Sequence, residues 1–167
     1  MGTDAHRAAA EERGPVSVGV ITVSDSRTKE TDTNGAWLHE RIAAVGAVVS
    51  GYHVVRDEPD EIRAAVDELV QGAQVVVVNG GTGVSKRDTT YDTLARLLEK
   101  TLPGFGELFR MLSWEQVGAA AMLSRATAGV YRDTAVISLP GSPAAVRLAW
   151  EKLIAPELEH LAWEITR

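Results

Sequence analysis

Four short segments of this chain combine acids, glycines and hydroxyl groups in a way that suits phosphate chemistry. They are Ser24-Asp25-Ser26, Arg56-Asp57-Glu58, Gly80-Gly81-Thr82-Gly83 and Leu139-Pro140-Gly141-Ser142-Pro143. Each segment directly follows an apolar run that is typical of a buried strand. Because ligands of open α/β sheets bind outside the carboxyl ends of the strands, the sequence predicts that these segments line one pocket.

The segment Gly80–Gly83 has three glycines in four positions. Glycine lets backbone N–H groups turn towards a ligand without side chains in the way, so the loop is a candidate phosphate site. A tight turn that requires positive φ would explain the same glycines. The loop lacks both the Walker A spacing and the GxGxxG fingerprint, so it predicts neither a P-loop nor a dinucleotide site.

The second candidate phosphate loop, Pro140–Ser142, stands just before a predicted helix. Ser142 suits the N-cap and Pro143 suits the first helical turn, and a structural cap alone would explain both residues. A helix N-terminus is also a site for anions. Two such loops at one sheet edge indicate phosphate binding more strongly than either loop does alone.

Three aspartates, Asp25, Asp57 and Asp88, fall in predicted loops at that edge. In nucleotide sites Mg²⁺ is held by one or two carboxylates together with phosphate oxygens. The acids therefore suit a metal–nucleotide complex, and they suit equally well the start of the helices that follow them. Basic side chains near the same edge can offset phosphate charge. They are Arg27, Lys29, Lys86, Arg87, Arg110 and Arg125.

Strands and helices are predicted to alternate along most of the chain. Apolar β-branched runs predict strands at residues 16–23, 48–55 and 75–78, and the last is apolar on both faces, as in a central parallel strand. Helical spacing predicts helices between the strands, one of them beginning at Pro59, and a helix after Pro143 that Pro156 interrupts. Two short strands, 127–131 and 134–139, are expected to form a hairpin.

This alternation predicts an α/β fold. We expect a three-layer sandwich with a mostly parallel central sheet, helices on both faces, and a small β-hairpin near the C-terminal third. Residues 1–14 are predicted to be a flexible N-terminal tail, and residues 15–167 a single domain. A chain of 167 residues suits one domain, which at this size buries roughly 70% of the unfolded surface.

Composition narrows the possible partners. The net charge of −6 argues against nucleic acid, because binding a polyanion depends on neutralising its phosphates. No stretch of 18 apolar residues is present, so we expect no membrane partner. The chain has no cysteine, which excludes disulfides and thiolate metal sites and fits a cytoplasmic location.

Together, these motifs resemble the MoaB/Mog family of molybdenum cofactor biosynthesis proteins. The matching stretches keep the family order over nearly the whole chain: Thr22–Arg27, Val55–Glu58, Gly80–Gly83, Arg87–Asp88, Pro103–Glu107, Phe109–Arg110, Ser124–Ala126, Ala128–Gly129 and Leu139–Ser142. Residues 109–113 and 149–156 are more similar to the MoaB branch than to the Mog branch.

The resemblance implies a molybdopterin-binding fold and the activity of a molybdopterin adenylyltransferase. In this reaction AMP passes from the co-substrate ATP to the terminal phosphate of the substrate molybdopterin, with Mg²⁺ as cofactor, and pyrophosphate is released. By the same resemblance, Asp57 and Asp88 are catalytic and are candidate Mg²⁺ ligands. The residues implied to bind nucleotide or pterin are Ser24, Asp25, Gly80, Gly81, Thr82, Gly83, Ser124, Arg125, Pro140, Gly141 and Ser142.

The resemblance also implies a homo-oligomer, either a trimer or a dimer of trimers, with other molybdenum cofactor biosynthesis proteins as candidate partners. Many relatives have Asp-Val-Thr-Pro where this chain has Asp88-Thr89-Thr90-Tyr91, so the acid is kept and the start of the helix differs. The alternative function is that of a non-catalytic module that carries or presents molybdopterin in the same pathway.

Overall fold

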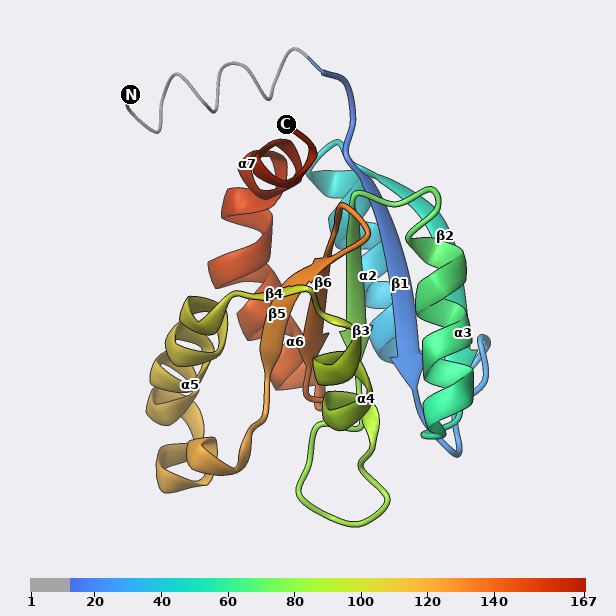
Figure 1. Cartoon of the computed structure of the whole chain (residues 1–167). Helices are drawn as coiled ribbons and strands as arrows, with labels where there is room; N and C mark the ends of the chain where they lie inside the picture. Colours follow the sequence, from blue (N-terminus) through green and yellow to red (C-terminus); the bar gives the residue numbers. More distant parts are fainter. Residues whose placement is uncertain (1–12) are drawn as a thin grey trace.

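A single mixed sheet forms the centre of the molecule (Figure 1). The structure is a computed structural model that describes residues 13–167, so nearly all of the predicted tail, residues 1–14, lies outside the described residues. The strands are β1 Ser17–Val23, β2 Val48–Val55, β3 Val75–Asn79, β4 Lys100–Thr101, β5 Thr127–Tyr131 and β6 Thr134–Leu139. Their order is β2-β1-β3-β6-β5-β4. The first four of these are parallel, β5 is antiparallel to β6, and β4 is antiparallel to β5.

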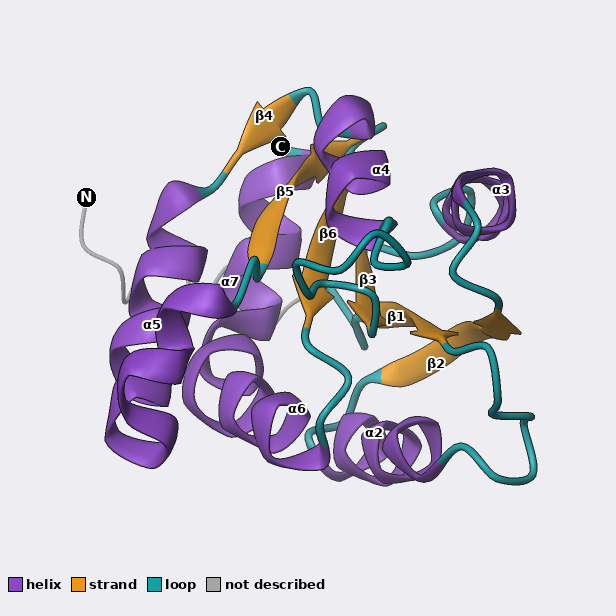
Figure 2. Cartoon of the chain, turned by 90° about the horizontal axis from the view of Figure 1, so that it is seen from below, coloured by secondary structure: helices purple, strands orange, loops and turns teal. Residues whose placement is uncertain are grey.

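Helices cover both faces of this sheet, which confirms the predicted α/β sandwich (Figure 2). The helical segments are α2 Thr33–Ala44, α3 Pro59–Leu69, α4 Thr90–Leu97, α5 Pro103–Val117, the 3₁₀ segment η1 Gly118–Leu123, α6 Pro143–Ala149, the π-helical segment η2 Trp150–Ile154 and α7 Ala155–Thr166. Helices α2, α5, α6 and α7 pack in one apolar cluster. Helices α3 and α4 pack in the cluster on the other face.

Strand β3 shows why the chain folds around this sheet. All of its residues are buried, with Val75 and Val77 in one apolar cluster and Val76 and Val78 in the other. Successive side chains of a strand point to opposite faces, so the four valines of a strand between two helical layers are all buried in apolar surroundings. The predicted central strand is confirmed.

The predicted hairpin is also confirmed. Strands β5 and β6 pair from Thr127–Ser138 to Tyr131–Thr134, and Arg132 and Asp133 between them have φ of 48° and 59°. Two consecutive residues with positive φ form the type of tight turn whose twist matches that of the strands.

Two details differ from the sequence-based expectations. Strand β4 was not predicted, because its two residues are exposed and too few to show a periodic pattern. Pro156 does not interrupt the helix that begins at Pro143. It lies in the first turn of α7, directly after the π-helical segment. In that wider turn the N–H of Ala155 bonds to the carbonyl of Trp150, and the chain accommodates a proline that has no N–H to donate.

Candidate functional site

Three strand ends meet at the carboxyl edge of the sheet. The N–H of Gly80 donates to the carbonyl oxygen of Leu139 at 2.9 Å. A Cβ on Gly80 would collide with the carbonyl of Val23, and a Cβ on Gly141 would lie 3.2 Å from the Cα of Gly80. The loops that follow β1, β3 and β6 therefore touch through backbone atoms, and the φ of +106° at Gly80 requires glycine there.

Asp57 lies between the glycine loop and the start of α4. Its Oδ1 accepts from the N–H of Thr89 at 3.1 Å, from Thr89 Oγ1 at 2.8 Å and from Thr90 Oγ1 at 3.4 Å. A Cβ on Gly81 would lie 2.7 Å from Asp57 Oδ2. The carboxylate thus stabilises the N-terminus of α4 with one oxygen and faces the glycine loop with the other.

Asp25, which follows β1, connects the end of β2 to the loop before α4. Its Oδ1 accepts from the backbone N–H of Asp57 at 3.1 Å, and its Oδ2 forms an ion pair with Arg87. The Arg87 hydrogen bond, followed by that of the Asp57 N–H, lowers the pKa of the Asp25 carboxyl. Asp25 is exposed, so this pair orients the loops more than it stabilises the fold.

Asp88 holds its own loop closed. Its Oδ2 accepts from the Ser85 N–H at 3.1 Å and from Ser85 Oγ at 2.6 Å, and it lies 2.6 Å from the place of a Cβ on Gly83. Helix α4 has Thr89 as its N-cap, so Asp88 does not cap it. Asp57 and Asp88 therefore flank the same glycine loop, one beside Gly81 and the other beside Gly83.

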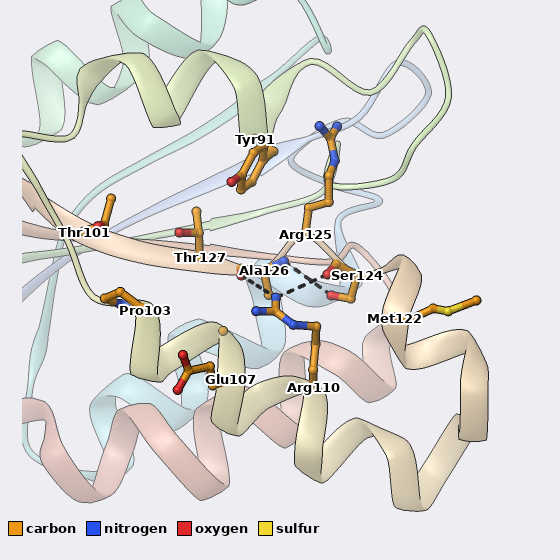
Figure 3. Close-up of a pocket in the computed structure, with 11 residues that line it drawn as sticks. Tyr91, Thr101, Pro103, Glu107, Arg110, Met122, Ser124, Arg125, Ala126 and Thr127 are labelled. Atoms are coloured by element: carbon orange, nitrogen blue, oxygen red, sulfur yellow. Dashed lines mark hydrogen bonds between the residues drawn. The ribbon is translucent and has the colours of Figure 1, made fainter.

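A cavity of about 440 Å³ opens next to these loops, between α4, α5 and β5 (Figure 3). Tyr91, Glu107, Arg110, Ser124 and Arg125 contribute to its lining. The Arg110 guanidinium donates to the carbonyls of Ser124 at 3.3 Å and Ala126 at 3.2 Å, shown as dashed lines in Figure 3. The cavity thus combines an aromatic ring with groups of both charge signs.

Comparison with known proteins shows the same fold and sequence pattern elsewhere. Residues 19–160 match the family described as "Probable molybdopterin binding domain". The chain is 48% identical over 151 residues, 89% of either chain, to molybdenum cofactor biosynthesis protein B of Bacillus subtilis. It superposes with a TM-score of 0.87 on a crystal structure of molybdenum cofactor biosynthesis protein B, at 46% identity over 90% of this chain and 96% of that one.

The chain belongs to the MoaB/Mog family. It is similar also to the tungsten cofactor synthesizing protein MoaB of Pyrococcus furiosus, with a TM-score of 0.83 and 37% identity over 92% of this chain and 98% of that one. The comparisons therefore confirm both the family and the fold that the sequence predicts.

In this MoaB/Mog site, Arg125 lies between the cavity and the glycine loop. Its Nη2 donates to the carbonyls of Gly83 at 2.6 Å and Asp88 at 3.2 Å, and its Nε donates to Gly83 at 3.0 Å. The guanidinium also lies 4.8 Å from the ring centre of Tyr91. Most of its donors are thus used to hold the loop in place.

The other predicted residues shape the loops around this site. Ser24 Oγ accepts from the N–H of Arg27 at 3.0 Å. Ser142 Oγ accepts from the N–H of Ala145 at 3.3 Å, which confirms it as the N-cap of α6. Thr82 is only 4% exposed, so it supports the glycine loop from within the protein. Pro140 lies between Leu139 and the Gly141 that contacts Gly80.

Two residues of this edge were missed from the sequence, Asn34 and Asn79. Asn79 is 1% exposed at the end of β3 and bonds to Asn34, which in turn bonds to the Gly141 carbonyl. A polar residue that closes a run of four valines was the available signal for Asn79. Nothing near Asn34 in the sequence indicates a partner 107 residues away.

Proposed function

We propose that this member of the MoaB/Mog family acts in molybdenum cofactor biosynthesis as a molybdopterin adenylyltransferase. A phosphate oxygen of molybdopterin would attack the α-phosphorus of ATP, the bond from that phosphorus to the β-phosphate oxygen would break, and pyrophosphate would leave. The observation that carries the proposal is the meeting of the glycine loop, the Gly141 loop and Asp57 at one edge of the sheet.

The backbone of Gly80–Gly83 and Pro140–Ser142 would bind the phosphates. The Gly80 N–H is already bonded to the Leu139 carbonyl, so the donors of the first loop would be the N–H groups of Gly81, Thr82 and Gly83. Each hydrogen bond to a charged acceptor contributes about 1.5–3 kcal/mol. The cavity beside Arg110 and Arg125 has room for the pterin, with the Tyr91 ring and the hydroxyl of Ser124 in its lining. A nucleophilic phosphate is already ionised at neutral pH, so the chain needs no strong general base.

Asp57 fits a role at a magnesium ion. In the described chain, the hydrogen bonds from Thr89 and Thr90 all reach its Oδ1, while its Oδ2 lies beside Gly81. Residues 13–167 contain no group of three or more acidic or histidine side chains that could by themselves hold a metal ion, so a bound Mg²⁺ would draw further ligands from phosphate oxygens. The ion would neutralise charge on the phosphates; Asp88, on the same loop, is the second candidate ligand.

The decisive experiment is an assay of purified protein with ATP, Mg²⁺ and molybdopterin, measuring adenylylated product and pyrophosphate. We expect both products from the unchanged protein. Asp57→Ala or Asp88→Ala should abolish their formation while the far-UV circular dichroism spectrum stays the same. Normal turnover by both variants would show that the roles assigned to these acids are wrong.

The alternative is a non-catalytic molybdopterin carrier. One observation favours it: Asp57 and Asp88 both have hydrogen-bond partners that would explain them as structural residues. Titration with Mg–ATP separates the two functions, because an enzyme must bind the nucleotide. Tight pterin binding without measurable Mg–ATP binding would support the carrier.

We also propose that the protein is a homo-oligomer, a trimer or a dimer of trimers. Six large apolar side chains of α5 and η1 are exposed: Leu108, Met111, Trp114, Val117, Met122 and Leu123. Exposed apolar surface that gathers on one part of a protein marks interaction sites. No helix of the described residues is long and apolar enough to cross a membrane. Sedimentation analysis of the unchanged protein and of Trp114→Glu tests the assembly, and a monomeric unchanged protein would contradict it.

A further inference from the structure

A buried amide lies directly beneath the candidate site. Asn79 Nδ2 donates to the carbonyl of Ile21 at 3.1 Å and to Thr22 Oγ1 at 2.9 Å. A carbonyl oxygen only accepts, so the nitrogen of this amide must face β1 and its oxygen must face the opposite way. That oxygen accepts from Asn34 Nδ2 at 3.0 Å, so both polar atoms of the side chain have partners and its orientation is fixed.

Asn34 extends this bond to the loop that follows β6. Its Nδ2 donates also to the carbonyl of Gly141 at 2.8 Å, so one amide nitrogen connects the end of β3 to the Pro140–Ser142 loop. Helix α2, which carries Asn34, is anchored by a buried N-cap. Its N-cap, Asp32, is 3% exposed and accepts from the Gly35 N–H at 3.1 Å and from the Tyr52 hydroxyl at 2.5 Å.

The Asn34 bond orients one peptide group of the candidate phosphate site. In a planar trans peptide the carbonyl and the next N–H point in opposite directions, so a Gly141 carbonyl that points to Asn34 directs the Ser142 N–H away from α2. Gly141 also packs against Gly80, whose N–H is bonded to the Leu139 carbonyl. A change at Asn34 therefore reaches both loops.

We propose that Asn34 is a positioning residue, which acts with Asn79 to hold the Gly141–Ser142 peptide at a fixed orientation and distance from the Gly80–Gly83 loop. The two loops are then aligned for the phosphates of one ligand before it binds. The identity of this ligand rests on the proposed function, whereas the proposed alignment of the loops does not depend on it.

Two variants separate positioning from a merely structural role. Asn34→Ala removes the amide, and Asn34→Asp places a carboxylate against two acceptors, Asn79 Oδ1 and the Gly141 carbonyl. An acid in the first turn of α2 stabilises a helix, so a structural role predicts that Asn34→Asp is tolerated better than Asn34→Ala. A positioning role predicts the reverse, namely that Asn34→Asp disturbs the two loops more than Asn34→Ala does. Glu40→Ala, an exposed position on the same helix, is the control.

The readouts are the Kd of Mg–ATP by calorimetry and the exchange rate of the Gly80 amide proton by NMR. We expect the Kd to rise about tenfold in Asn34→Ala and further in Asn34→Asp, with faster Gly80 exchange in both and no change in Glu40→Ala. An unchanged Kd in both variants would overturn the proposal. If the unchanged protein does not bind Mg–ATP, the proposed function fails, and Gly80 exchange alone then decides whether Asn34 aligns the loops.

Discussion

Replacing Asp57 by asparagine separates the two roles that the structure gives this side chain. Asparagine has almost the same shape and can keep an oxygen towards Thr89, but it carries no charge. Its second polar atom, beside Gly81, becomes an NH₂ group that can neither bind a cation nor counterbalance one. The structural contribution should therefore weaken, and the contribution to ligand binding should disappear.

The expected losses follow from the contacts. Oδ1 accepts two well-formed bonds from Thr89, at 3.1 and 2.8 Å. Hydrogen bonds to a charged acceptor contribute about 1 kcal/mol more than neutral ones, so Asp57→Asn should cost about 2 kcal/mol and lower Tm by about 4–8 °C. If Asp57 holds the ion that screens the reacting phosphates, the rate should fall on the order of 10²–10³-fold, comparable to the loss of one preorganised electrostatic group.

The assay is pyrophosphate release with saturating ATP, Mg²⁺ and molybdopterin, together with a thermal melt of the same sample. Asp60→Asn is the matched control, because Asp60 is an exposed aspartate three residues further on in the first turn of α3. A variant that melts earlier but keeps its rate within about threefold would refute the reasoning and leave Asp57 as a structural residue only.

Three further substitutions have expected outcomes. Tyr52→Phe should lower the free energy of unfolding by about 1–3 kcal/mol at pH 8, because the buried Asp32 loses a donor; denaturant titrations measure this. Burial and the Asp32 bond raise the pKa of Tyr52, so its contribution to the stability of the unchanged protein should be constant up to about pH 10 and fall above it. The phenylalanine variant should lack this part of the fall. Ser138→Ala should raise Tm by about 2–4 °C, since Ser138 Oγ is buried and has no hydrogen-bond partner in the described chain; a lower Tm would contradict this. Arg87→Ala should return the pKa of Asp25 upwards in an NMR titration, and an unchanged titration would disprove the ion pair.

The fold was predictable because its information is local. Four consecutive valines specify a strand buried on both faces, and the alternation of such runs with helical ones leaves few arrangements other than a parallel sheet between helices. Strand β4 has no such signal, since its two residues are exposed and pair with β5. The π-helical turn before Pro156 depends on how the helix packs, and no periodic pattern in the sequence indicates it.

The place of the candidate site was predictable for a different reason. Parallel strands bring their carboxyl ends to one edge, so the convergence of the four loops follows from topology. The bonds within that edge do not. Asp57 contacts Thr89 over 32 residues, and Asn34 contacts Gly141 over 107. Three-dimensional packing determines these partners. From the sequence alone, each acid is equally suited to cap a helix or to take part in phosphate chemistry.

For Asp57, the structure is compatible with both roles at once, stabilisation of the α4 N-terminus and ligand binding. The bonds from Thr89 and Thr90 all reach Oδ1, and they hold the carboxylate so that Oδ2 stays beside Gly81. A carboxylate held by one oxygen loses less freedom when the other binds a cation, so the structural bonds would strengthen ligand binding. It follows that Thr89→Ala, which removes the shorter of the two Thr89 bonds, should weaken Mg–ATP binding although Thr89 itself touches no phosphate in this proposal. Unchanged Mg–ATP affinity in Thr89→Ala, measured by calorimetry, would show that the two roles of Asp57 are independent.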